Sequence, residues 1–174
     1  MIVKHDCNEN WCCYSDSEQT QSLPDISELL SQINSLPKTL KDDRRSLVKQ
    51  GSLLGKTVIA KQPRDKLRKK WSRLLSLVAS AESKKTFTSL IEFKRKGINS
   101  VEPLFVLEKR KLGMVTDSWL VYEFREGQPC QADCLPEIVE VLNDIHSKGY
   151  RHDDPNLGNF MRADDGSIFL IDFK

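Results

Sequence analysis

The chain has 174 residues, the length of one ordinary domain, and its 39% hydrophobic and 30% charged content is typical of a globular protein. Its first residues lack the basic and apolar segments of a signal peptide, and it has no run of about 18 apolar residues, so we expect neither secretion nor a membrane span. The expected location is therefore the cytoplasm, and no nucleic-acid partner is expected beyond a nucleotide.

The first 37 residues predict one strand and one helix. Residues 2–14 mix β-forming and polar residues and are expected to form a single edge strand. The segment SLPDISELLSQINSL then repeats apolar residues at three- and four-residue spacing, which is typical of an amphipathic helix. Ser22 is its expected cap, and Pro24 suits the first helical position.

The five cysteines are odd in number and fall into two distant groups, which does not fit a disulfide framework. We therefore expect reduced cysteines in a reducing compartment. The alternative is a zinc site, which would have to complete four ligands from three scattered histidines. Cys12 and Cys13 are neighbours, so on a strand they would point to opposite faces.

The middle of the chain predicts a small sheet with one or two helices. β-Branched residues and turn signals indicate strands, and a glycine after an apolar helical pattern indicates a helix end. The expected elements are a hairpin within 38–62 that ends in Ala60 and Lys61, a helix from about Glu82 to Lys96 closed by Gly97, and strands at 98–108 and 119–124.

Positive charge is concentrated between Lys61 and Arg73, where the sequence reads KQPRDKLRKKWSR. Such a density suggests an anionic partner, and the alternative is a solvated helix face whose side-chain stems pack along the protein. With Trp71 among them, Lys66 to Arg73 are expected to meet either anionic lipid or a phosphorylated glycan.

The residues that indicate an enzymatic reaction lie in the last 40 positions of the chain. A helix is predicted from Leu135 to Gly149, followed by a loop and a short hairpin. In the loop HDDPNLGNF, Asp154 precedes Asn159 by five residues, and Asp172 follows Asn159 by thirteen. This is the order of a kinase catalytic loop, in which the first Asp accepts the substrate proton and the Asn and second Asp hold Mg²⁺.

Other parts of a nucleotide site are predicted upstream. The strand TVIAK resembles the pattern in which a lysine contacts ATP phosphates, which makes Lys61 the candidate. No glycine-rich loop precedes it, so DDRRS at 42–46 is the expected replacement. The carboxylate partner of Lys61 is left open between Glu92 and Glu82. The remaining candidates are Arg44 and Arg45 for phosphate charge, and the backbone of Glu123, Phe124 and Arg125 for adenine.

With these motifs in hand, the sequence resembles the bacterial lipopolysaccharide core heptose kinase family. The resemblance lies in TVIAKQPRDKLRKKWSRLLSL, SWLVYEF, LNDIHSKGYRHDDPNLGNF and DGSIFLIDFK, in that order. It implies an ATP- and Mg²⁺-dependent enzyme that phosphorylates a heptose hydroxyl of the lipopolysaccharide inner core. The site of action would be the cytoplasm, or the cytoplasmic face of the inner membrane. The chain departs from the family at Asp153, where a glycine is usual.

The fold implied is α+β and protein-kinase-like, with a small β-rich N-lobe and a partial helical C-lobe truncated after the metal-binding Asp172. The expected division is an N-terminal extension at 1–37, an N-lobe at 38–126 and a partial C-lobe at 127–174. Two alternatives stay open. One is a kinase with a small-molecule or protein acceptor, and the other is a non-catalytic pseudokinase that uses the fold for binding.

Overall fold

A computed structural model describes residues 2–8, 10–18, 22–64 and 81–171. The predictions for Asp172 and for the basic stretch Lys66 to Arg73 therefore lie outside the described residues. The chain forms two compact units, one made of Met1–Thr88 and Pro103–Phe124 and the other of Ser89–Glu102 and Arg125–Lys174. Among the described residues, no helix is long and apolar enough to cross a membrane.

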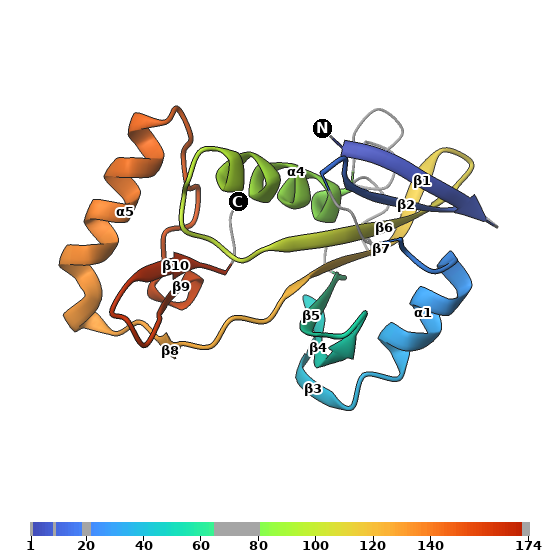
Figure 1. The fold of residues 1–174 in the computed structure, drawn as a ribbon, viewed down its shortest axis with the longest axis horizontal. Coiled ribbons are helices and arrows are strands. Elements are labelled where there is room, and N and C mark those ends of the chain that lie inside the picture. The colour runs from blue at the N-terminus through green and yellow to red at the C-terminus, as the bar shows by residue number, and fades with distance from the viewer. Residues whose placement is uncertain (1, 9, 19–21, 65–80, 172–174) are drawn as a thin grey trace. The chain divides into compact units, whose positions relative to one another are not determined.

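The first unit is built on a seven-stranded antiparallel sheet (Figure 1). In space the strands follow the order β1-β2-β6-β7-β5-β4-β3, so β1 and β3 are the edges. Residues 2–14 were expected to form one strand, but they form the hairpin of β1 and β2, which continues the sheet beyond β6. The strands are β1 (Ile2–Asn8), β2 (Trp11–Asp16), β3 (Lys38–Asp42), β4 (Ser46–Leu53), β5 (Lys56–Pro63), β6 (Pro103–Lys111) and β7 (Met114–Glu123).

One face of this sheet packs against helix α1 (Ile26–Asn34). The helix buries Ile26, Leu29 and Ile33 at the predicted spacing. Its cap is Asp25, whose side chain accepts the backbone N–H of Glu28 at 2.9 Å, so the expected cap Ser22 and start at Pro24 are wrong. The sheet residues in this core are Cys13, Leu53, Val58, Ala60, Leu104, Phe105, Leu107, Trp119 and Val121.

The opposite face of the sheet holds Lys61 and the start of helix α4 (Glu82–Arg95). Side chains alternate along a strand, so Lys61 points away from the face of Ala60 and shares its face with its register partner Leu120. On that same face, Ser118 hydrogen-bonds Ser83 of α4 at 2.9 Å. The sheet therefore presents Lys61 on the face that receives α4.

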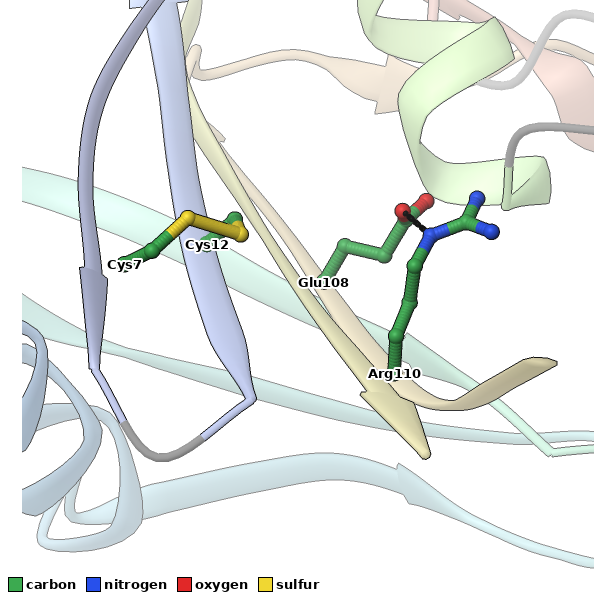
Figure 2. Close-up of a disulfide and its surroundings, with 4 residues drawn as sticks. All are labelled: Cys7, Cys12, Glu108 and Arg110. Carbon is green, nitrogen blue, oxygen red and sulfur yellow. Dashed lines mark hydrogen bonds and ion pairs between the residues drawn. A yellow bond between two sulfur atoms is a disulfide. The ribbon is translucent and has the colours of Figure 1, made fainter. Parts of the chain in front are cut away.

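A buried carboxylate fixes the beginning of α4. Glu108 is 1% exposed and pairs with Arg110 Nε at 2.6 Å (Figure 2). Its other carboxylate oxygen accepts the backbone N–H of Ala81 at 2.9 Å. Nearby, Lys84 of α4 lies over the ring of Tyr14 on β2, 3.6 Å from its centroid. Strands β2 and β6 together thus hold the first turn of the helix.

Replacing Glu108 by alanine should lower the free energy of unfolding by about 3 kcal/mol, because it leaves the buried backbone N–H of Ala81 without its acceptor and the half-buried Arg110 without its carboxylate partner. Urea denaturation followed by circular dichroism measures this loss. The matched control is Glu102→Ala, which removes an exposed ion pair with Lys94 and should change stability by less than about 0.5 kcal/mol. Equal losses in both variants would contradict the role given to Glu108.

The second unit combines helix α5 (Leu135–Ser147) with the short strands β8 (Gln128–Pro129), β9 (Phe160–Arg162) and β10 (Ile168–Leu170). The predicted helix stops are confirmed: Gly97 has φ +66° after α4 and Gly149 has φ +86° after α5. In each case a backbone bond spans the end, from Ile98 N to Phe93 O and from Tyr150 N to Ile145 O. The predicted hairpin across Asp164 to Gly166 is also confirmed.

The cysteines differ from the expectation. Cys7 and Cys12 are register partners in the hairpin of β1 and β2 and form a disulfide (Figure 2). The expectation of reduced cysteines is therefore wrong for this pair, because the hairpin register that makes them face each other was not seen in the sequence. Cys13 points to the opposite face, into the α1 core, as predicted for a neighbour on a strand.

Candidate functional site

The loop between α5 and β9 brings together Asp154 and Asn159. The Asn159 side chain is 8% exposed, and its Nδ2 donates to the backbone carbonyl of Asp154 at 2.7 Å. Because the amide nitrogen is used as a donor there, the side-chain atom of Asn159 suited to a metal ion is Oδ1. The five-residue spacing thus closes a loop whose two polar residues are fixed to each other.

Asn156 was missed by the sequence analysis and holds the Asp154 carboxylate. Its Nδ2 donates to Asp154 Oδ1 at 2.9 Å, and its backbone N–H donates to the Asp154 carbonyl at 2.9 Å. The Asn159 N–H in turn donates to the Asn156 carbonyl at 3.0 Å. The signal available in the sequence was an asparagine two residues after an aspartate, which is a common local turn pairing.

His152 is buried beside this loop and hydrogen-bonds its backbone. It is 5% exposed and lies beside the ring of Phe160, with centroids 5.7 Å apart. Its Nδ1 accepts the backbone N–H of Asp154 at 3.2 Å, which requires this nitrogen to carry no proton. In contrast, Asp153 is exposed and faces Arg151 at 3.7 Å in solvent. The extra carboxylate beside Asp154 therefore points its charge toward water.

The chain returns to this loop just before Asp172. The backbone N–H of Ile171 donates to the Asn159 carbonyl at 3.0 Å. On the preceding residue, Leu170 exchanges backbone bonds with Asn99 and Val101 in the same unit. The hairpin of β9 and β10 thus carries the residue next to Asp172 back to Asn159, although Asp172 itself lies outside the described residues.

Lys61 lies in the middle of the sheet, between Val48 on β4 and Leu120 on β7. Its side chain is half-buried. Of the two carboxylates left open as its partner, Glu82 begins α4 in the same unit as Lys61. Glu92 lies in the other unit, where it accepts the Tyr150 hydroxyl at 2.8 Å.

Arg44 and Arg45 lie at the exposed tip between β3 and β4. Asp43 shapes this tip by accepting the N–H groups of Ser46 and Arg45, and these backbone donors, Ser46 first, hold the pKa of Asp43 below its usual value. The Arg45 carbonyl also accepts the N–H of Arg64 at 2.8 Å. Because Arg64 follows Lys61 by three residues, the tip lies at the end of the sheet toward which β5 runs after Lys61.

The predicted adenine-binding segment lies where the chain passes from the first unit to the second, between Phe124 and Arg125. The Phe124 N–H donates to the Thr57 carbonyl at 2.8 Å, so this group is already used. Glu123 pairs with Lys56 at 2.6 Å. The Arg125 guanidinium donates to Asn99 Oδ1 and lies 4.3 Å from the ring of Phe169. Adenine recognition by the remaining backbone groups stays a prediction.

Two buried thiols, Cys130 and Cys134, lie near the start of α5. They are 6% and 2% exposed, and burial, followed by the hydrogen bond to Cys134, raises the pKa of Cys130 to about 11. A protonated, buried thiol is a poor nucleophile, because the thiolate is the reactive form. The pair is therefore suited to packing rather than to chemistry.

Iodoacetamide should accordingly alkylate Cys130 at least ~100-fold more slowly in the folded protein than in urea at pH 7.5. Because its folded pKa is raised above the unfolded value, the fraction of thiolate in the folded protein should grow only as pH approaches about 11. Peptide mass spectrometry after timed alkylation measures both rates. Equal labelling of folded and unfolded protein at pH 7.5 would show that this thiol is open and ionised.

Comparison with known proteins bears on the fold. No protein-family model matches the sequence, and no curated protein does. Among solved structures the chain is similar to one described as WaaP in complex with acyl carrier protein, at TM-score 0.50 and 15% identity. The match covers 83% of this chain and 64% of that one. Together with the strand order, it confirms an α+β, protein-kinase-like fold with a β-rich unit and a smaller, partly helical unit.

Proposed function

We propose that the chain is an ATP-dependent phosphotransferase that adds phosphate to a heptose hydroxyl of the lipopolysaccharide inner core. The observation that carries the proposal is that Asn159 makes two hydrogen bonds that organise this loop. Its side chain fixes the Asp154 carbonyl, and its own carbonyl fixes Ile171, the residue before Asp172. These contacts support a role for Asp154 and Asn159 in phosphoryl transfer, with Asp172, the residue after Ile171, proposed as their third partner.

In this proposal Asp154 orients the acceptor hydroxyl and takes its proton, because a carboxylate held by Asn156 is aligned before the substrate arrives. Asn159 Oδ1 and Asp172 supply the hard oxygen donors that suit Mg²⁺. The ion would neutralise charge on the ATP phosphates when bound. Lys61, with Arg44 and Arg45 at the hairpin tip, would contact the same phosphates, and the segment Glu123 to Arg125 the adenine.

The sugar acceptor is supported by the sequence resemblance to the lipopolysaccharide core heptose kinases, which spans the strand of Lys61 and the loop of Asp154. The fold shared with WaaP is compatible with that family. Lipopolysaccharide is membrane-bound, so we further propose that the basic stretch Lys66 to Arg73 contacts the cytoplasmic face of the inner membrane. The division into an N-lobe at 38–126 and a partial C-lobe at 127–174 belongs to the same proposal.

The test is phosphate incorporation from radiolabelled ATP with Mg²⁺ into a panel of acceptors. Dephosphorylated lipopolysaccharide core represents the proposed acceptor, an aminoglycoside represents a small molecule, and casein represents a protein. We expect label in the lipopolysaccharide core alone. Label in either of the other acceptors would retain the phosphotransferase and replace the substrate, whereas nucleotide binding without label in any acceptor would favour a pseudokinase.

A further inference from the structure

The disulfide of Cys7 and Cys12 lies on the outermost strand of the large sheet. Among the strands that the structure describes, β1 pairs with β2 alone. Cys7 is exposed and Cys12 half-buried, and their Cα atoms are 4.2 Å apart. A small thiol in solution can therefore reach the bond without opening the core.

The disulfide joins an edge strand to a strand that supports α4. Cys12 is the register partner of Glu108, the buried carboxylate that holds the Ala81 N–H. Two residues along β2, Tyr14 lies under the ammonium of Lys84 on α4. Figure 2 shows the disulfide on β1 and β2 beside the pair of Glu108 and Arg110. The disulfide thus holds β1 to β2, the strand whose Tyr14 contacts the first turn of α4.

We propose that Cys7 and Cys12 form a reversible thiol–disulfide site whose reaction partner is a low-molecular-weight thiol of the glutathione class. The thiolate of the small molecule attacks one of the two sulfur atoms, the bond between the cysteines breaks, and a mixed disulfide forms. A second small thiolate then attacks the mixed disulfide and releases its disulfide product. The protein gains two electrons and two protons, and two small thiols are oxidised. The reverse reaction closes the site again.

The position of the pair favours reversibility. Only four residues separate Cys7 from Cys12, and closing so short a loop restrains the unfolded chain less than closing a long one. The rest of the sheet does not depend on β1, because β2 pairs with β6 over residues 11–15. Cys13 is next in sequence but 2% exposed on the other face, which keeps it from exchanging with the pair. Reduction should therefore loosen β1 while the sheet stays folded.

The test equilibrates the full chain in buffers of defined ratios of reduced to oxidised glutathione, followed by acid quenching, alkylation and peptide mass spectrometry. We expect one two-thiol transition, located at Cys7 and Cys12, within the range of ratios that glutathione can set. Amide hydrogen exchange of residues 2–8 should be at least ~10-fold faster in the reduced protein, while β5 and β7 are unchanged.

Two variants control the experiment. Cys13→Ala should keep the transition, whereas the double variant Cys7→Ser, Cys12→Ser should lose it and exchange residues 2–8 at the reduced rate in every buffer. If either variant fails to fold, the reduced wild-type chain supplies the same comparison. The proposal is overturned if Cys7 and Cys12 stay entirely reduced or entirely oxidised across all ratios, or if residues 2–8 exchange equally in both states.

Discussion

Asp154→Asn is expected to lower the rate of phosphoryl transfer by a factor of about 10²–10⁴, the range that a positioned general base contributes. The substituted side chain keeps an oxygen that can accept the Asn156 amide, so the loop geometry should be retained. What is lost is the carboxylate that takes the proton of the acceptor hydroxyl. Initial rates of phosphate incorporation at saturating ATP measure the effect.

The matched control for this variant is the neighbouring carboxylate. Asp153→Asn removes a charge of the same type one residue away, but its side chain faces solvent and Arg151. Exposed ion pairs contribute little, so we expect a rate within about threefold of the original. If both variants lose activity to the same extent, the loss reflects the local charge of the loop, and Asp154 is not the base.

Substituting Asn159 should lower the rate of phosphoryl transfer about as much as Asp154→Asn, for two reasons that can be separated. Asn159→Ala removes both the amide that donates to the Asp154 carbonyl and the oxygen proposed for Mg²⁺, and we expect at least a ~100-fold loss, as follows from small misplacements of catalytic groups. Asn159→Asp keeps an oxygen for the ion but cannot donate to the Asp154 carbonyl, so its Mg²⁺ requirement should stay close to the original while its rate stays below the original.

The measurement for Asn159 is the rate as a function of Mg²⁺ concentration. Asn159→Ala should need more Mg²⁺ for half-maximal rate, whereas Asn159→Asp should need an amount close to the original. Asn143→Ala, on the exposed side of α5, is the control and should behave as the original chain. An unchanged Mg²⁺ requirement in Asn159→Ala would remove this residue from the metal site.

Local features of the structure could be predicted from the sequence because local residues determine them. Gly97 and Gly149 end their helices since both need a positive φ, and the turn at Asp164 to Gly166 closes a hairpin between apolar strands. The hairpin after Asn159 was predicted from the same kind of local signal. These predictions needed no knowledge of tertiary contacts.

Features that depend on strand register or on competing partners were not predictable in the same way. The disulfide required knowing that Cys7 faces Cys12, and this depends on the turn between two strands that were read as one. Asp25 competed successfully with Ser22 as a cap because it lies one residue before the helix begins. Likewise, the Phe124 N–H donates to the Thr57 carbonyl because of how the strands pair in the sheet, and residues 123–125 alone do not indicate this bond.

The central claim, that the chain is a Mg²⁺-dependent ATP-binding phosphotransferase, is tested most directly by titration calorimetry with a non-hydrolysable ATP analogue. We predict binding that requires Mg²⁺, is weakened at least ~10-fold by Lys61→Ala, and is unchanged by Lys49→Ala. Lys49 lies on the neighbouring strand and bonds the Asn34 carbonyl, so it matches Lys61 in type but not in proposed role. An absence of binding, or equal weakening by both substitutions, would contradict the account.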